Sequence, residues 1–265
     1  MTSYHFYNYF PHDVRRIIFA LTNPGKFKKL QYKRKIDAAE NDYSLKSFDE
    51  HQCIFVHIPK AAGVSICRSL FGNLAGGHTP MKTYELLYSK KTFDSYFKFT
   101  FVRNPWDRLF SAYYFLKAGG LNETDKRWSV DNLGKYENFE EFILYGIRGT
   151  NILAYTHFRP QLDFLRGAQG KKPLVDFWGF YENLQNDFKI IQKRIFGDSL
   201  RELLHLNKAK ASQTPCYKEC YTDDMKRIVE SIYQDDISLF GYNFENTTIN
   251  QQIENRNQRF QITFK

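Results

Sequence analysis

The sequence has no long apolar run. Of its 265 residues 42% are hydrophobic, yet the apolar stretch near the N-terminus, at 17–21, is only Ile-Ile-Phe-Ala-Leu. A membrane-spanning helix needs roughly 18 such residues, and the stretch is also too short for the apolar core of a signal peptide. We therefore expect a soluble, cytoplasmic protein without a transmembrane segment.

Cysteine is scarce. Four cysteines in 265 residues are too few for a disulfide scaffold. Cys53 and Cys67 lie in apolar stretches, where cysteine behaves as a small core residue. The spacing of Cys216 and Cys220 does not match a common zinc pattern, and no carboxylate cluster suited to magnesium is visible. We expect no metal.

Positive charge is in excess. The formal net charge of +9 favours an anionic ligand, which could be nucleic acid, a membrane surface, a polyanionic glycan or a phosphorylated cofactor. The segment KFKKLQYKRK at 26–35 carries much of this charge on an expected helix. That helix is either a solvated basic face or a surface for a membrane or an acidic partner.

Strands and helices alternate along the chain. The buried strands expected at 53–57 and 97–102 are each followed by a loop and a helix, at 63–72 and 106–118. This order predicts an α/β fold with a parallel sheet, with a third strand at 174–180. Further helices are expected at 13–22, 26–40, 138–147, 182–196 and 222–234, and a polar surface loop at 119–137.

Composition divides the chain into three parts. Residues 1–50 form a basic helical lead-in, 51–245 the main domain, and 246–265 an Asn- and Gln-rich tail that we expect to be loosely attached. No internal repeat is visible.

The first strand-to-helix junction, HIPKAAGVS at 57–65, is suited to a phosphate-like group. Small residues let backbone N–H groups approach such a group, the helix N-terminus adds partial positive charge, and Lys60 adds a full one. The lysine precedes the glycine, so this is not a Walker A loop, and a kinase that uses ATP is disfavoured. The alternative is a tight turn with an exposed lysine.

The second junction, FTFVRNPWDRLFSAYYF at 99–115, places Arg103 at a strand end and Ser111 about two helical turns into the next helix. A guanidinium fork with a hydroxyl is a good clamp for a second phosphate. The alternative is that Arg103 pairs with Asp107.

Together the two junctions resemble the 5′-phosphosulfate and 3′-phosphate motifs of sulfotransferases that use 3′-phosphoadenosine 5′-phosphosulfate (PAPS). The resemblance is to the family that includes the Golgi carbohydrate sulfotransferases, heparan sulfate 2-O-sulfotransferase and their bacterial relatives. It is close over 53–72 and 97–116 and loose elsewhere. It implies a three-layer, P-loop-NTPase-like α/β fold, with a central parallel sheet flanked by helices.

The resemblance also implies residue roles in donor binding. Residues that match the two motifs and a nucleotide-closing loop would bind PAPS: Lys60, Ala61, Ala62, Gly63, Val64 and Ser65 at the 5′-phosphosulfate, Arg103 and Ser111 at the 3′-phosphate, and Asn207 and Lys208 in the loop. Ala61 replaces the threonine usual in the family, so backbone N–H groups must serve there.

Relatives carry a histidine between the two motifs, and His78 fits that position as the catalytic base. A histidine with a pKa near neutrality can take the proton of the attacking acceptor. His57 is a rival, although the end of a buried strand suits an orienting role better. His157, Arg159 and Gln161 are assigned to the acceptor side or, equally, to the scaffold.

These residues predict an in-line displacement at sulfur, in which Lys60 stabilises the charge that grows on the bridging oxygen and His78 activates the nucleophile. The acceptor is expected to be a hydroxyl of a carbohydrate or small molecule, with a nitrogen of a small natural product as the alternative. A non-catalytic polyanion binder would explain the charge but not two anion clamps, and nucleic-acid-binding signatures are absent. The oligomeric state stays open.

Overall fold

The computed structural model describes residues 9–170, 172–199, 201–204 and 215–261. They form two compact units. The first unit takes its residues from 1–58, 62–101 and 162–206, and the second unit takes its residues from 59–61, 102–161 and 207–265. The predicted domain boundaries after residues 50 and 245 stay a prediction, because compact packing does not test independent folding.

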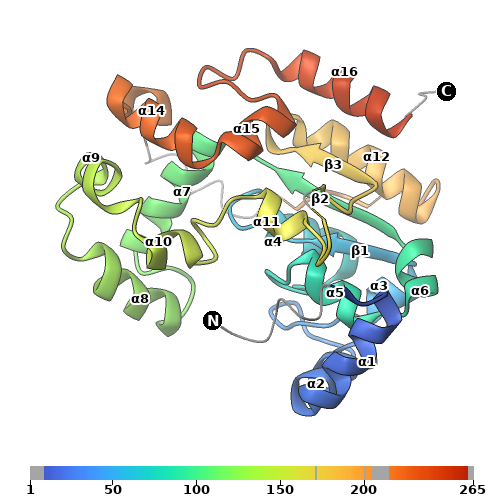
Figure 1. The fold of residues 1–265 in the computed structure, drawn as a ribbon. Coiled ribbons are helices and arrows are strands. Elements are labelled where there is room, and N and C mark those ends of the chain that lie inside the picture. The colour runs from blue at the N-terminus through green and yellow to red at the C-terminus, as the bar shows by residue number, and fades with distance from the viewer. Residues whose placement is uncertain (1–8, 171, 200, 205–214, 262–265) are drawn as a thin grey trace. The chain divides into compact units, whose positions relative to one another are not determined.

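The first unit is built on a small sheet. Strands β1 (Cys53–Val56), β2 (Phe97–Val102) and β3 (Phe177–Phe180) lie in the order β1-β2-β3 (Figure 1). β1 and β2 are parallel, with the register running from Cys53 opposite Phe97 to Val56 opposite Thr100. This pairing confirms the parallel sheet that the alternating pattern predicted. All of β2 belongs to the first unit except its last residue, Val102, which belongs to the second.

The strands are buried because most of their side chains are apolar, as expected for parallel strands covered by helices. The polar exceptions are Lys98 and Thr100 of β2, which are also buried. The rings of Phe55 and Phe99 stack with centroids 5.0 Å apart. The Thr100 hydroxyl donates to the carbonyl of Val56 at 2.7 Å, so the one polar side chain at this point of β2 is satisfied within the sheet.

Helices surround this sheet in the first unit. They are α1 (His12–Thr22), α2 (Pro24–Lys33), α3 (Lys46–Glu50), α4 (Gly63–Phe71), α5 (Met81–Leu87), α6 (Lys90–Ser95), α11 (Leu162–Leu165) and α12 (Leu184–Phe196), the last preceded by a 3-10 turn at Tyr181–Asn183. Among them, α3 contacts β1 and α12 contacts β3. The unit is therefore α/β, as predicted.

The helix predicted over 26–40 is wrong in its second half. α2 ends at Lys33, where the carbonyl accepts the backbone N–H of Leu45 at 2.8 Å. The Ser44 hydroxyl donates to the Ile36 carbonyl at 2.6 Å. These contacts from a distant segment satisfy the carbonyls that a longer helix would have used.

The described part of the second unit contains helices and no named strand apart from the end of β2. Its helices are α7 (Pro105–Lys117), α8 (Glu123–Leu133), α9 (Phe139–Glu141), a π-helical turn η2 (Phe142–Gly146), α10 (Thr150–Ala154), a 3-10 turn η4 (Tyr217–Cys220), α14 (Asp223–Ile232), α15 (Gln234–Phe240) and α16 (Ile249–Phe260). The predicted helices at 106–118, 138–147 and 222–234 are all present, the second as α9 and η2.

α7 begins as its sequence predicts. The Asn104 side chain accepts the backbone N–H of Trp106 at 3.1 Å, and Pro105 occupies the first helical position. Its aromatic face is buried: Phe110 meets Phe139 edge-on, with ring centroids 5.2 Å apart. This packing fixes the helix that carries Ser111.

The surface loop predicted over 119–137 is wrong, because α8 occupies its centre. The Asn122 side chain caps the helix by accepting the backbone N–H of Asp125 at 3.0 Å. Trp128 stacks on Tyr155, with centroids 3.7 Å apart and 7° between the rings. This contact with a distant residue stabilises a segment whose polar composition indicated a loop.

The expectation of a loosely attached tail does not hold for α16. Gln252 and Arg256 on this helix are buried, with 3% and 1% exposure, and the Gln252 amide donates to the carbonyl of Phe240 at 2.9 Å. α16 therefore packs within the second unit through polar side chains, which a search for apolar periodicity does not detect. No helix among the described residues is long and apolar enough to cross a bilayer.

Candidate functional site

The backbone of the first motif, at 57–65, contains two residues in an uncommon conformation. Lys60 and Ala62 adopt left-handed conformations, with φ of 69° and 62°, which cost roughly 1–2 kcal/mol for a residue with a Cβ. α4 begins directly afterwards at Gly63, and no side chain caps it. The first N–H groups of a helix have no intrahelical partner, so this uncapped start can bind an anion.

Gly63 is required by a histidine. A Cβ at this position would lie 1.8 Å from the His57 ring, so no other residue fits while that ring is in place. His57, the residue directly after β1, is buried, with 5% exposure. The sequence pattern predicts that Gly63 lets the backbone approach an anion, and the structure adds that Gly63 makes room for His57.

His78 lies against the same histidine. The two rings are 4.3 Å apart at 63°, and His78 Nδ1 lies 3.2 Å from the His57 carbonyl oxygen. Since a carbonyl only accepts, Nδ1 must carry the proton, and the neutral ring then has its lone pair on Nε2. That tautomer can act as a base through Nε2.

Two glycines shape the loop before His78. A Cβ at Gly76 would lie 1.9 Å from the Tyr84 hydroxyl. Gly77 has φ of +56°, and a Cβ there would lie 2.7 Å from the Tyr43 ring. The Gly-Gly-His sequence is thus needed to pass between two tyrosines of the first unit.

Lys60 itself belongs to the second unit and lies among aromatic and charged groups. Its Nζ is 3.9 Å from the centroid of the Phe115 ring, a cation–π distance. Burial, reinforced by the positive charge of Arg103 and partly offset by Asp125, lowers the pKa of Lys60 to about 8. The lysine is therefore mostly protonated at neutral pH but close to its titration range.

Arg103 makes the ion pair that the sequence left as an alternative. Its guanidinium binds both carboxylate oxygens of Asp107, each at 2.8 Å. It also donates to the backbone carbonyl of Lys60 at 2.9 Å. Arg103 thus ties the lysine loop to the start of α7, and Ser111 is half-buried on the same helix.

Asp125 is the residue of this cluster that the sequence did not reveal. It is buried, with 8% exposure. Its carboxylate accepts the Tyr155 hydroxyl at 2.6 Å and the backbone N–H of Leu121 at 3.0 Å, and lies 3.7 Å from His157 Nε2.

The charge of Asp125 follows from these contacts. Burial alone would raise its pKa, but the interactions with His157, Tyr155 and Leu121 outweigh burial and hold the pKa below its usual range. The group is an anion at neutral pH. The signal that could have found it is the Asn-Glu-Thr-Asp start at 122–125, a helix cap followed by an acidic first turn.

His157 faces this carboxylate inside the second unit. Burial lowers its pKa despite the opposing effect of Asp125, and the nearby charges of Lys60 and Arg108 lower it further. The ring centroids of His157 and Phe115 are 5.1 Å apart. Phe115 therefore contacts both Lys60 and His157, which brings one predicted acceptor-side residue near the predicted catalytic lysine.

The other two acceptor-side candidates have scaffold contacts. Gln161 has 0% exposure, and its amide both accepts from the Arg103 N–H and donates to the Arg103 carbonyl, each at 2.9 Å. The Arg159 side chain donates to the Ala154 carbonyl at 3.0 Å. The structure therefore gives Gln161 a clear role in fixing the backbone of Arg103.

Two predicted residues, Asn207 and Lys208, lie outside the described residues. Within the described ranges, no group of three or more histidine, cysteine or acidic side chains is arranged to hold a metal ion. Cys53 and Cys67 are buried, as predicted.

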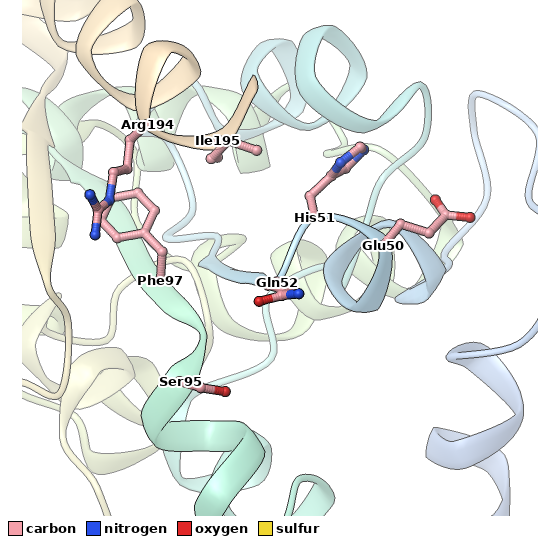
Figure 2. A pocket seen from close by; sticks show the side chains of 7 residues that line it. All are labelled: Glu50, His51, Gln52, Ser95, Phe97, Arg194 and Ile195. Carbon is pink, nitrogen blue, oxygen red and sulfur yellow. The ribbon is translucent and has the colours of Figure 1, made fainter. Parts of the chain in front are cut away.

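A separate pocket lies in the first unit, away from the predicted residues in sequence. Figure 2 shows its lining side chains: Glu50, His51, Gln52, Ser95, Phe97, Arg194 and Ile195. None of them is a predicted site residue, although Phe97 is the first residue of β2, the strand that leads to Arg103. This pocket does not include the residues on which the anion-binding argument depends.

Comparison with known proteins gives consistent results. Carbohydrate sulfotransferase 14 of Danio rerio is 26% identical over 233 residues, covering 76% of this chain and 62% of that protein. An uncharacterised protein of Archaeoglobus fulgidus is 34% identical over 106 residues, covering 40% of this chain and 72% of that protein. This chain thus spans less than two thirds of the length of the carbohydrate sulfotransferase.

No solved structure matches the chain. The sulfotransferase family profile matches residues 43–243, a segment that contains both strand-to-helix junctions, the histidine pair and the Lys60 cluster. This match covers well over half of the sequence, and the chain therefore belongs to the sulfotransferase family.

Proposed function

We propose that this enzyme transfers a sulfuryl group from PAPS to a hydroxyl of a carbohydrate or small molecule, releasing adenosine 3′,5′-bisphosphate. The observation that carries the proposal is the uncapped N-terminus of α4, preceded by Lys60 and Ala62 in left-handed conformations. Successive N–H groups at such a turn form a concave site for an anion. The family match supplies the type of reaction.

The donor would lie along the two motifs. Backbone N–H groups and small side chains from Ala61 to Ser65, with Lys60, would hold the 5′-phosphosulfate. The Arg103 guanidinium and the Ser111 hydroxyl would hold the 3′-phosphate. Asp107 already offsets the charge of Arg103. Arg103 would therefore contribute to phosphate binding through the fixed orientation of its guanidinium more than through net charge. Asn207 and Lys208 would close over the nucleotide.

Lys60 would act on the leaving group. The donor supplies an activated sulfur whose bridging oxygen becomes negative as the acceptor attacks. A protonated lysine beside that oxygen stabilises the transition state, and the α4 N-terminus adds to the effect. The pKa of about 8 means that Lys60 keeps its proton at neutral pH but can lose it in mild alkali.

His78 would act on the acceptor. With Nδ1 bonded to the His57 carbonyl, Nε2 is the atom that takes the proton of an attacking hydroxyl. A nitrogen acceptor on a small natural product is the alternative, since a neutral amine would need less help from this base. His157 and Arg159 remain assigned to the acceptor side, whereas Gln161 is better explained as scaffold.

We also propose that the enzyme has the complete three-layer fold. The described sheet has three strands, and a complete three-layer, P-loop-NTPase-like arrangement is supported by the family match and by the strand-to-helix order of both motifs. A high-resolution structure of the enzyme with bound nucleotide would test that arrangement.

A thermal-shift experiment tests the proposed donor. Adenosine 3′,5′-bisphosphate should raise the melting temperature in a concentration-dependent manner, because a ligand that binds only the folded state stabilises it. Adenosine 5′-monophosphate is the matched control that lacks the 3′-phosphate. Stabilisation by ATP with magnesium alone would contradict the proposal, and a PAPS-dependent assay on a panel of acceptors, read by mass spectrometry, would identify the acceptor class.

A further inference from the structure

The first helix of the first unit is apolar on its outer side. Val14, Ile17 and Leu21 on α1 are exposed by 38%, 54% and 76%, and their spacing of three and four residues places them on one side of the helix. The opposite side is already buried, through Arg15 and Phe19. A surface helix normally turns polar residues to solvent, so this outer apolar stripe needs another explanation.

The next helix adds positive charge. α2 has no buried residue, and Lys26, Lys28 and Lys29 on it are exposed. Tyr32, on the same helix, is 63% exposed. Residues 9–37 contain eight lysines and arginines against two aspartates, so most of the net charge of the chain is concentrated here.

Local carboxylates do not neutralise this charge. Asp13 accepts the backbone N–H of Lys90, and Asp37 pairs with Lys46. Over the described ranges, Lys26, Lys28 and Lys29 have no carboxylate within ion-pair distance. Repulsion between neighbours is also visible, since burial and the charge of Lys29 lower the pKa of Lys33.

The two helices form a fixed platform and not a loose extension. Arg15 makes a buried ion pair with Glu85 of α5 at 3.1 Å, and the His12 ring lies 3.0 Å from the Tyr88 carbonyl oxygen. Between the helices, Phe19 and Phe27 meet edge-on, with centroids 6.2 Å apart. The exposed stripe is therefore held in place on the first unit.

We propose that this surface, formed by Val14, Ile17, Leu21, Lys26, Lys28, Lys29 and Tyr32, binds the face of an anionic lipid membrane. Exposed apolar side chains on α1 and exposed lysines on α2, the helix in contact with it, match the two parts of such a membrane, its acyl boundary and its charged headgroups. A nucleic acid or an acidic polysaccharide would use the lysines but offers no apolar phase for Ile17 and Leu21. The membrane is thus the partner that accounts for both features.

This proposal does not depend on sulfuryl transfer, because none of these residues belongs to either motif. It can be tested on the full chain by sedimentation with vesicles. Vesicles of phosphatidylcholine with phosphatidylglycerol should bind the protein, vesicles of phosphatidylcholine alone should bind it much less, and added salt should weaken binding to the former.

Two variants separate the apolar and charged contributions. Ile17→Gln with Leu21→Gln should weaken binding to the anionic vesicles by roughly tenfold or more, because two large side chains no longer enter the acyl boundary. Lys26→Gln, Lys28→Gln and Lys29→Gln together should weaken it by roughly a hundredfold, at about fivefold for each lysine near the surface.

Matched controls use exposed residues elsewhere. Val130→Gln is the control for the apolar change, because Val130 is 67% exposed on α8. Its vesicle binding is compared with that of Leu21→Gln. Lys126→Gln, Lys135→Gln and Lys189→Gln together remove the same charge from other exposed positions. Unchanged melting temperatures would show that the variants fold.

Three results would overturn the proposal. The first is no binding to anionic vesicles at low salt. The second is an equal loss in the lysine variant and its charge-matched control, which would mean a general charge effect. The third is that the protein binds heparin or nucleic acid but not vesicles, and that the Ile17 and Leu21 changes leave this binding intact. That result would make this a polyanion-binding surface.

Discussion

The histidine pair of the first unit and the lysine cluster of the second are held by different kinds of interaction. His57 and His78 are placed by shape: a glycine makes room for one ring, and a backbone carbonyl orients the other. Lys60 is placed among charges and an aromatic ring, which set its protonation as well as its position. We therefore expect a change at the contact between Gly63 and His57 to act through packing, and changes around Lys60 to act through charge.

The largest effect is expected from Lys60→Ala. Removing the cation beside the leaving oxygen should lower kcat by about 10²–10³-fold, the usual cost of one transition-state donor. Steady-state kinetics would measure this loss, and adenosine 3′,5′-bisphosphate should still raise the melting temperature because the backbone contacts remain. A variant with wild-type kcat would remove Lys60 from the chemistry.

His78→Ala should lower kcat by about 10²-fold, toward the lower limit for loss of a general base. His78→Gln is the matched variant, because it keeps a polar side chain without a titrating nitrogen and should be equally impaired. If turnover survives in both variants, the base is His57 or His157 instead. The acid limb of the pH profile in single variants of His57 and His157 would show which of the two it is.

Gly63→Ala sharpens the packing side of the comparison. The added methyl group would collide with the buried His57 ring and should lower the free energy of unfolding by about 1–3 kcal/mol, the usual cost of overpacking. Denaturant unfolding would measure it.

Gly25→Ala is the control for this change. Nothing lies within 4 Å of a Cβ at Gly25, so that variant should be at least as stable as the native chain. Combining Gly63→Ala with His57→Ala should recover part of the loss, and a purely additive double variant would contradict the assigned contact.

The smallest effect, and the one that tests the charge side, is expected from Asp125→Asn. The Asp125 carboxylate raises the pKa of Lys60, so its loss should lower that pKa. Activity that needs protonated Lys60 would then decline at a lower pH than in the native enzyme, whose alkaline limb should lie near pH 8. The pH dependence of kcat/KM reports the free enzyme and would show this shift.

Asp131→Asn is the control on the same helix, because Asp131 is exposed and should leave the limb in place. If both variants moved the limb equally, or neither did, Asp125 would not be coupled to Lys60.

Much of the local structure could be predicted because its signals lie within a few residues. Asn104 and Pro105 start α7, and Gly72, with φ of 70°, ends α4. Where prediction failed, distant residues decided. α8 depends on the stacking of Trp128 with Tyr155, and α2 stops at Lys33 because Leu45 binds its carbonyl.

The sequence by itself determined the order of the anion-binding elements: a buried strand, Lys60, small residues and a helix start, then a second strand ending at Arg103. Adjacent residues encode that order. The tertiary structure alone decided that Arg103 pairs with Asp107 while holding the Lys60 carbonyl, and that Asp125 lies in the same cluster. The charge of Lys60 depends on groups from distant segments that share a low-dielectric environment, and their distances exist only in the folded chain.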